Sequence, residues 1–217
     1  MIDERFDIDL LRAMADAHPE WQLVMVGPIV KIDQATLPRN PNIHYMGQAS
    51  YDELPQYLAG WDVCLLPFAL NESTRFISPT KVLEYMAAEL PIVSTAITDV
   101  VKPYGEIVSV AYSQEEFIAD CEAALVMTDA QRSSQIAAMR EVAKATSWSS
   151  TATQMHALIE APLQAKPGIA TGVVAGAARV NPLRGNPVFI PGSKVADVVV
   201  AASASAGVAA GLSVAGE

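Results

Sequence analysis

The stretch DVCLLPFALNESTRFISPTKVLEYMAAELPIVST, residues 62–95, decides the fold class. It starts with the apolar run DVCLLPF and ends with the apolar run LPIVST, and short runs without polar alternation are typical of strands buried on both faces. Between them, apolar residues recur at helical spacing from Pro79 onward. A strand, a helix and a second strand of this kind form one unit of a parallel sheet with helices on both faces. The stretch therefore predicts a Rossmann-like α/β fold.

The same alternation continues on either side of this stretch. Further strands are predicted at WQLVMVG (residues 21–27), NIHYMG (42–47) and EIVSVA (106–111). Helices are predicted at residues 7–17, 50–61, 113–127, 129–145 and 147–161. Ser50 with Glu53 three residues later has the pattern of a capping box at a helix start. One domain over residues 1–161 accounts for all of these elements.

The composition changes at residue 162 to mainly Ala, Gly, Val and Pro, so residues 162–217 are predicted to form a linker and a low-complexity tail. Residues 195–217 have the pattern of a strand that turns into a helix. Ala202, Ala204 and Gly207 take the three positions of a GxGxxG fingerprint directly after DVVV. Two interpretations stay open: the start of a degenerate dinucleotide-binding unit, or a tail without a site.

The bulk composition excludes several classes of function. The formal net charge is -10 at pH 7, and so acidic a chain is not expected to bind nucleic acid, whose phosphates need a basic surface. Cys64 and Cys121 lie in apolar segments without CxxC spacing, which predicts buried free thiols and a cytoplasmic, reducing location. The histidines show no ligand spacing, so no metal is expected. No segment has the pattern of a membrane span.

Lys81 stands out within the predicted helix. If this helix starts at Pro79 with Ser78 as its cap, Lys81 falls in the first turn, where the helix dipole already presents positive charge. A lysine is unfavourable there unless an anion sits at the helix start. Glu84 lies one turn further on, so the alternative is an ordinary exposed ion pair between the two side chains. The buried face of the helix is predicted to consist of Val82, Leu83, Met86, Ala87 and Leu90.

The residues 42–68, NIHYMGQASYDELPQYLAGWDVCLLPF, and 71–95, NESTRFISPTKVLEYMAAELPIVST, resemble the donor-binding, C-terminal half of retaining GT-B glycosyltransferases of family four, group one. The resemblance covers roughly residues 6–161. It implies that a nucleotide-diphosphate sugar binds as donor in a cleft between two Rossmann-like domains. The implied activity is transfer of a sugar to an acceptor with retention, in polysaccharide biosynthesis, without a cofactor or an essential metal.

The resemblance also implies roles for individual residues. Lys81 would neutralise charge on the donor diphosphate, and Glu84 would accept hydrogen bonds from ribose hydroxyls as the second glutamate of an E-x7-E motif. The first glutamate of that motif falls at Phe76, where Asn71, Glu72, Thr74 and Arg75 are the nearby substitutes. The other residues implied at the donor site border the cleft, the base or the diphosphate, and they are Gly27, Pro28, Met46, Gly47, Arg75, Ser78, Pro79 and Thr80.

The chain departs from the family in several places. An N-terminal acceptor domain is missing, and so is the first strand of the donor domain. The basic residue near that strand, which usually contacts the diphosphate, is missing too, so a fragment is expected. Any contact with a membrane would be peripheral and would pass through that acceptor domain. Glu89 stands where relatives often carry Gly. The alternatives are a non-catalytic binding or regulatory module of GT-B ancestry, the N-terminal part of a fusion with a flavin-dependent nucleotide-sugar mutase, and a nucleotide-sugar epimerase.

Overall fold

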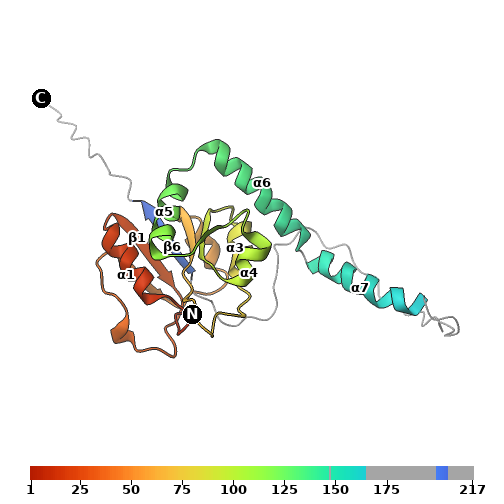
Figure 1. Cartoon of the computed structure of the whole chain (residues 1–217), viewed down its shortest axis with the longest axis horizontal. Coiled ribbons are helices and arrows are strands. Elements are labelled where there is room, and N and C mark those ends of the chain that lie inside the picture. The colour runs from red at the N-terminus through yellow and green to blue at the C-terminus, as the bar shows by residue number, and fades with distance from the viewer. Residues whose placement is uncertain (147, 165–198, 205–217) are drawn as a thin grey trace, which may run out of the picture. The chain divides into compact units, whose positions relative to one another are not determined.

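The computed structural model describes residues 1–146, 148–164 and 199–204 (Figure 1). The chain forms two compact units. The first comprises residues 1–140 with 195–217, and its described part holds the sheet and the candidate site. The second comprises residues 141–194, and its described part is helical.

A six-stranded sheet organises the first unit. In chain order its strands are β1 (Trp21–Val26), β2 (Ile43–Gly47), β3 (Val63–Leu66), β4 (Ile92–Thr95), β5 (Ser109–Ala111) and β6 (Val199–Ala204). Their order across the sheet is β2-β1-β6-β3-β4-β5. The pairs β1–β2, β3–β4 and β4–β5 are parallel. The predicted Rossmann-like α/β architecture is therefore confirmed. Strands β1 and β2 form one half of the sheet, and β3, β4 and β5 form the other.

β6 occupies the middle of the sheet and runs antiparallel to both of its neighbours. It pairs with β1 from Trp21↔Ala204 to Val26↔Val199, and with β3 from Val63↔Ala202 to Leu65↔Val200. Ala202 and Ala204 therefore lie inside a strand, whereas a dinucleotide fingerprint requires these positions in the turn that follows one. Gly207 lies outside the described residues, and so does the predicted linker from residue 165 to residue 194.

Helix α1 (Ile8–Ala17) begins where the sequence predicts, because Asp7 caps it. The Asp7 carboxylate accepts a hydrogen bond from the N–H of Leu10 at 2.9 Å. Asp7 and Asp9 thus lie at a helix start, where acidic side chains suit the dipole. At the other end, the His18 ring stacks on Trp21 with ring centres 3.8 Å apart, and its Nε2 lies 2.8 Å from a Glu122 carboxylate oxygen.

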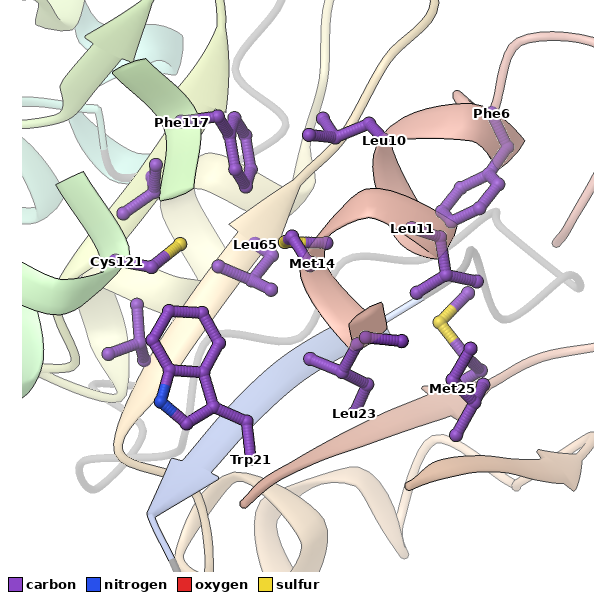
Figure 2. Close-up of a cluster of buried hydrophobic side chains, with 14 of the residues drawn as sticks. Phe6, Leu10, Leu11, Met14, Trp21, Leu23, Met25, Leu65, Phe117 and Cys121 are labelled. Atoms are coloured by element: carbon purple, nitrogen blue, oxygen red, sulfur yellow. The ribbon is translucent and has the colours of Figure 1, made fainter. Parts of the chain in front are cut away.

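One side of the sheet packs against α1 and α5 (Gln114–Leu125) to form the main core (Figure 2). Leu23 of β1 and Leu65 of β3 point toward Leu11 and Met14 of α1, with Phe117 of α5 closing the layer. All five side chains are fully buried. Shortening such a side chain to Ala typically costs about 2–5 kcal/mol, so this layer supplies much of the stability of the unit. Figure 2 also shows the ribbon of β6 between those of β1 and β3.

The remaining helices differ from the prediction mainly at their ends. α2 covers Leu54–Leu58, α6 covers Asp129–Ala145, and α7 covers Trp148–Gln164. The Glu53 carboxylate accepts hydrogen bonds from the N–H and the hydroxyl of Ser50, both at 2.7 Å, but the helix starts only after Glu53. α7 continues through Pro162 to Gln164, so residues 162–164, which were predicted to be linker, are helical.

Two short elements are absent from the prediction: a 3-10 turn at Gln34–Thr36 and helix α4 at Thr98–Tyr104. Both cysteines are free and buried, as predicted. Burial raises the pKa of the Cys64 thiol and of the Cys121 thiol, so both stay protonated.

Candidate functional site

Helix α3 (Lys81–Ala87) starts two residues later than predicted. Thr80 is the residue before the helix, it has a helical backbone conformation, and its side chain makes no capping hydrogen bond. The prediction of Ser78 as the cap was wrong, because residues 79–82 form a turn in which the N–H of Val82 bonds to the Pro79 carbonyl at 3.2 Å. The buried face was also partly wrong, because Lys81 and Tyr85 are buried and Ala87 is exposed.

Lys81, which is buried, and Glu84, which is partly buried, form an ion pair. The Lys81 Nζ lies 2.6 Å from Oε2 of Glu84, and the two side chains are 8% and 18% exposed. The pair is thus not the exposed surface contact of the alternative interpretation. A lysine ammonium has three N–H groups, and Glu84 is its acceptor among the residues that the structure describes. Two N–H groups of Lys81 remain for a ligand.

Lys81 also lines a pocket of about 110 Å³ at the carboxyl end of β3. The pocket brings together three short segments of the first unit, which are residues 1–6, residues 65–68 and residues 77–81. In an open α/β sheet this edge is where ligands bind. The structure therefore unites Ser78, Pro79, Thr80 and Lys81 of the predicted site at one cavity.

The first segment contributes a second cation to this pocket, Arg5. Its guanidinium Nη2 lies 2.5 Å from Oδ2 of Asp3, and its Nε lies 3.0 Å from both carboxylate oxygens. Asp3 is only 2% exposed. Burial acts to raise the pKa of Asp3, but hydrogen bonds from the Arg5 side chain and backbone outweigh it and hold that pKa below its usual value. Asp3 is therefore an anion that fixes Arg5 in place.

The loop between β3 and α3 is tied to the same segment. The N–H of Ala69 donates to the Arg5 carbonyl at 2.8 Å, and the Asn71 side-chain amide donates to the Glu4 carbonyl at 3.3 Å. Within the loop, the buried Thr74 hydroxyl donates to the Ala69 carbonyl at 2.5 Å. Thr74 thus holds the loop together, which leaves its hydroxyl poorly placed to replace the missing glutamate at position 76.

Thr95, at the end of β4, fixes the other side of the loop. Its hydroxyl accepts a hydrogen bond from the N–H of Phe68 at 3.1 Å and donates to the Phe68 carbonyl at 2.8 Å. Since Pro67 and Phe68 line the pocket, this threonine sets one wall of the cavity from the neighbouring strand.

A second group of predicted residues lies at the carboxyl ends of β1 and β2. The N–H of Gly27 donates to the Gly47 carbonyl at 2.7 Å, and both glycines have positive φ angles, 142° and 72°. Such angles favour glycine. The Pro28 carbonyl accepts from the N–H of Ile2 at 2.8 Å, while Met46 is exposed. These four predicted residues do not line the pocket, but the segment that begins at Ile2 connects them to it.

Arg75 and Phe76 lie on the outer part of the loop. The Phe76 side chain is 83% exposed, and the guanidinium of Arg75 lies 5.2 Å from the centre of its ring. Arg75 also approaches Glu72, with 3.6 Å between Nη1 and Oε2. Arg75 therefore lies outside the pocket that Lys81 lines.

The sequence of this chain matches the family described as glycosyl transferases group 1 over residues 7–127. The match spans β1 to β5 and α1 to α5, and it includes Lys81, Glu84 and the loop before them. The chain belongs to this family. The GT-B type of glycosyltransferase predicted from residues 42–95 is thereby confirmed.

A relative is found in Bacillus subtilis (strain 168). It is a protein whose provisional name is teichuronic acid biosynthesis glycosyltransferase TuaH, and it is 28% identical to this chain over 130 residues. The match covers 57% of this chain and 33% of the relative. The chain thus spans about a third of the length of the curated relative that it matches.

Two further properties of the described residues concern membranes and metals. No helix there combines the length and the apolar character that crossing a bilayer would require. No group of three or more His, Cys, Asp or Glu side chains within that part of the chain is arranged to hold a metal ion.

Sequence reasoning missed Arg5 and Asp3. Neither residue was among the predicted site residues, yet both line the pocket beside Ser78 and Lys81. The available signal was the segment IDERF, residues 2–6, in which three charged residues stand between two apolar residues that are buried in the structure. Because the flanking residues Ile2 and Phe6 are anchored in the core, the charged residues between them lie close to it and can line a cavity there.

Proposed function

We propose that this chain is the donor-binding part of a retaining glycosyltransferase and that the diphosphate of a nucleotide sugar binds in the pocket lined by Arg5 and Lys81. The observation that carries the proposal is the convergence of two fixed cations on the carboxyl edge of β3, in a chain of the glycosyl transferases group 1 family. Each cation is positioned by its own carboxylate, so neither has to be ordered when the ligand arrives.

The chemistry that follows is stabilisation of the leaving group. When the bond between the sugar and the diphosphate breaks, negative charge grows on the diphosphate oxygens. Lys81 can donate two hydrogen bonds to that charge, and Arg5 adds a second positive centre. Fixed donors at such a position typically lower a barrier by a few kcal/mol each, because they need no reorganisation during the reaction.

The size of the cavity limits which part of the donor it holds. Pockets for whole small molecules usually measure about 300–1,000 Å³, and this one measures about 110 Å³. It suits a diphosphate group rather than a complete nucleotide sugar. The rest of the donor then lies outside the cavity. On the proposal, the base lies toward Met46 and Gly47, and Gly27 and Pro28 lie between the base and the diphosphate. Glu84 accepts hydrogen bonds from the ribose hydroxyls.

The relative's name places that protein in teichuronic acid biosynthesis, and for this chain we propose polysaccharide biosynthesis on the same ground. The buried free thiols of Cys64 and Cys121 support a cytoplasmic location. An acceptor domain is the partner that a GT-B enzyme requires, and on the proposal it is supplied outside the matched residues.

A binding screen tests the proposal. UDP-, GDP- and ADP-sugars, and the corresponding nucleosides, are titrated into the full chain by calorimetry, with Lys81→Ala, Glu84→Ala and Lys144→Ala as variants. Lys144 is an exposed lysine on α6 and serves as the charge-matched control. We expect Lys81→Ala to weaken binding of nucleotide diphosphates far more than of nucleosides, Glu84→Ala to weaken both, and Lys144→Ala to change neither. An absence of binding by every sugar nucleotide would favour the non-catalytic module instead.

A further inference from the structure

We infer that the space between β1 and β3 is a strand-binding site, filled in this chain by its own residues 199–204, and that this strand aligns the two halves of the proposed donor site. The part that concerns the donor rests on the proposed function. The strand-binding site itself rests on the sheet alone.

The topology provides the first argument. β1 and β2 pair with each other on one side, and β3, β4 and β5 pair in sequence on the other. Among the described strands, β6 alone forms ladders with both halves. It comes from the far end of the chain and runs against the direction of β1 and β3, so it enters the sheet as a separate segment rather than as part of the regular βαβ order.

The chemistry of the space provides the second argument. Leu23 of β1 and Val63 and Leu65 of β3 are fully buried, so the backbone N–H and C=O groups on the facing edges of these strands lie in apolar surroundings. Leaving such groups without hydrogen-bond partners is costly. The space therefore selects an extended segment with a complete set of backbone donors. The sequence VVAASA at 199–204 fits, because it contains no proline and its residues are small or β-branched.

The register provides the third argument. Val199, the first residue of β6, is opposite Val26, which directly precedes Gly27. Val200 is opposite Leu65, which lines the pocket. The beginning of β6 therefore lies at the carboxyl edge of the sheet, between the half that carries Gly27 and Gly47 and the half that carries Lys81.

A consequence for the site follows from this position. β6 lies outside residues 7–127, which match the family, yet within the sheet it is the link between the two groups of predicted donor residues. The layer of α1 and α5 and the loop contacts of residues 1–6 also join the halves. Loss of β6 would thus leave a core in place but would free the two carboxyl edges to shift against each other.

A cross-link tests which segment fills the space. Ala201 of β6 is in register with Cys64 of β3, and opposed residues of neighbouring strands are close enough for a disulfide. Ala201→Cys is made in a Cys121→Ala background and the protein is refolded in an oxidising glutathione buffer. Ala202→Cys is the matched control, because its partners are Val63 and Leu23.

We expect an intramolecular disulfide with Ala201→Cys and none with Ala202→Cys, as measured by mass spectrometry and a non-reducing gel. Equal amounts in both variants, or none in either, would overturn the assignment of residues 199–204 to this space. A covalent dimer would also overturn it, because the strand would then come from a second copy of the chain.

A second experiment tests the role of the strand. Val200→Pro removes a ladder hydrogen bond in the centre of the sheet, and Ala209→Pro, beyond the strand, is the control. We expect hydrogen exchange in β1 and β3 to rise roughly tenfold or more with little change at the β4–β5 ladder, and a peptide of residues 197–206 to restore protection when added. Equal loss of protection in all ladders, without rescue by the peptide, would show that β6 is ordinary core structure.

Binding of a sugar nucleotide is measured separately on the same variants. If Val200→Pro abolishes binding and the peptide restores it, the strand aligns the donor site. Unchanged binding with exchange raised in β1 and β3 would refute the alignment. The cross-link and the exchange measurement use no ligand, so they remain decisive even if the unmodified chain binds no sugar nucleotide at all.

Discussion

The ammonium of Lys81 and the carboxylate of Glu84 lie 2.6 Å apart, one turn apart on α3, where packing removes most of both side chains from water. Surface pairs with this spacing contribute a few tenths of a kcal/mol. A buried pair behaves differently, since each partner needs the other to offset the cost of leaving water. The arrangement keeps a charged lysine beside a cavity.

Removing Lys81 alone is expected to destabilise the protein strongly. Lys81→Met leaves the partly buried Glu84 carboxylate without its cation, and breaking a buried pair in this way costs at most about 3–5 kcal/mol. The double variant Lys81→Met with Glu84→Gln removes both charges and should recover much of that loss. Urea unfolding of the two single variants and the double variant measures the coupling. Strictly additive effects would contradict a mutual dependence of the two side chains.

Asp3 is expected to make the protein sensitive to acid. Its pKa in the folded protein lies below the usual value of 3.8 because of Arg5, so the unfolded chain takes up the proton first as the pH falls. The stabilisation is complete above about pH 4–5 and is lost as the pH falls through the lowered pKa. The free energy of unfolding of Asp3→Asn should therefore fall less steeply between pH 5 and pH 3.

The exposed Asp9, which pairs with Arg12, provides the control for this measurement. Asp9→Asn should leave the pH dependence nearly unchanged. In Arg5→Met, burial raises the pKa of Asp3 against only the backbone N–H at position 5 and the charge of Lys31. Asp3 should then make the free energy of unfolding decrease as the pH rises through the raised pKa, the reverse of its contribution in the wild type. Identical pH profiles for the wild type and Asp3→Asn would rule out this role for the pair.

Thr95→Val tests the wall of the pocket. Valine has the shape of threonine but cannot accept from the N–H of Phe68 or donate to its carbonyl, so we expect a loss of about 1–3 kcal/mol. Thr95→Ser keeps the hydroxyl and should cost only about 1 kcal/mol for the lost methyl group. Chemical denaturation ranks the three proteins, and a valine variant at least as stable as the serine variant would show that these hydrogen bonds contribute little.

Glu89 is expected to respond to substitution through its backbone. Its φ angle is 59°, which glycine adopts without strain, and its carboxylate receives hydrogen bonds from Arg140 at 2.6 Å and 2.9 Å. Both Glu89→Gly and Glu89→Ala lose this ion pair, but only Ala keeps the strain. The Ala variant should therefore melt about 2–4 °C below the Gly variant.

Calorimetry provides the melting temperatures for this comparison. Arg140→Gln isolates the ion pair, because the hydrogen bonds from Arg140 are what lower the pKa of Glu89, so its pKa should return toward the ordinary value in that variant. A Gly variant that melts below the Ala variant would contradict the strain at this position.

Much of the fold could be predicted because its elements carry their own signals. The strands are apolar runs, the first helix has an apolar stripe at helical spacing, and Glu89 was identified as a glycine site through the resemblance to the family. α4 was missed because it is short and contains Pro103, which is unusual inside a helix. The late start of α3 depends on the turn at Pro79, which residue type alone does not determine.

The candidate site could be predicted where its residues follow one another in sequence, as Ser78 to Lys81 do. Arg5 was missed because it comes from a distant segment, and only the folded chain brings it to the same cavity. β6 posed the same difficulty in a stronger form. Its residues are typical of a strand, but whether they join this sheet depends on unpaired backbone groups in β1 and β3, which a local pattern does not contain.

The position of β6 also determines where the protein is vulnerable to aggregation. The outer strands of the sheet are β2 and β5, and β5 has only three residues. Short outer strands give another molecule little backbone to pair with. If β6 detaches, however, the apolar edges of β1 and β3 open in the middle of the sheet. Storage or expression conditions that detach β6 would then promote aggregation through the exposed edges of β1 and β3. The outer strands β2 and β5 would contribute little to it.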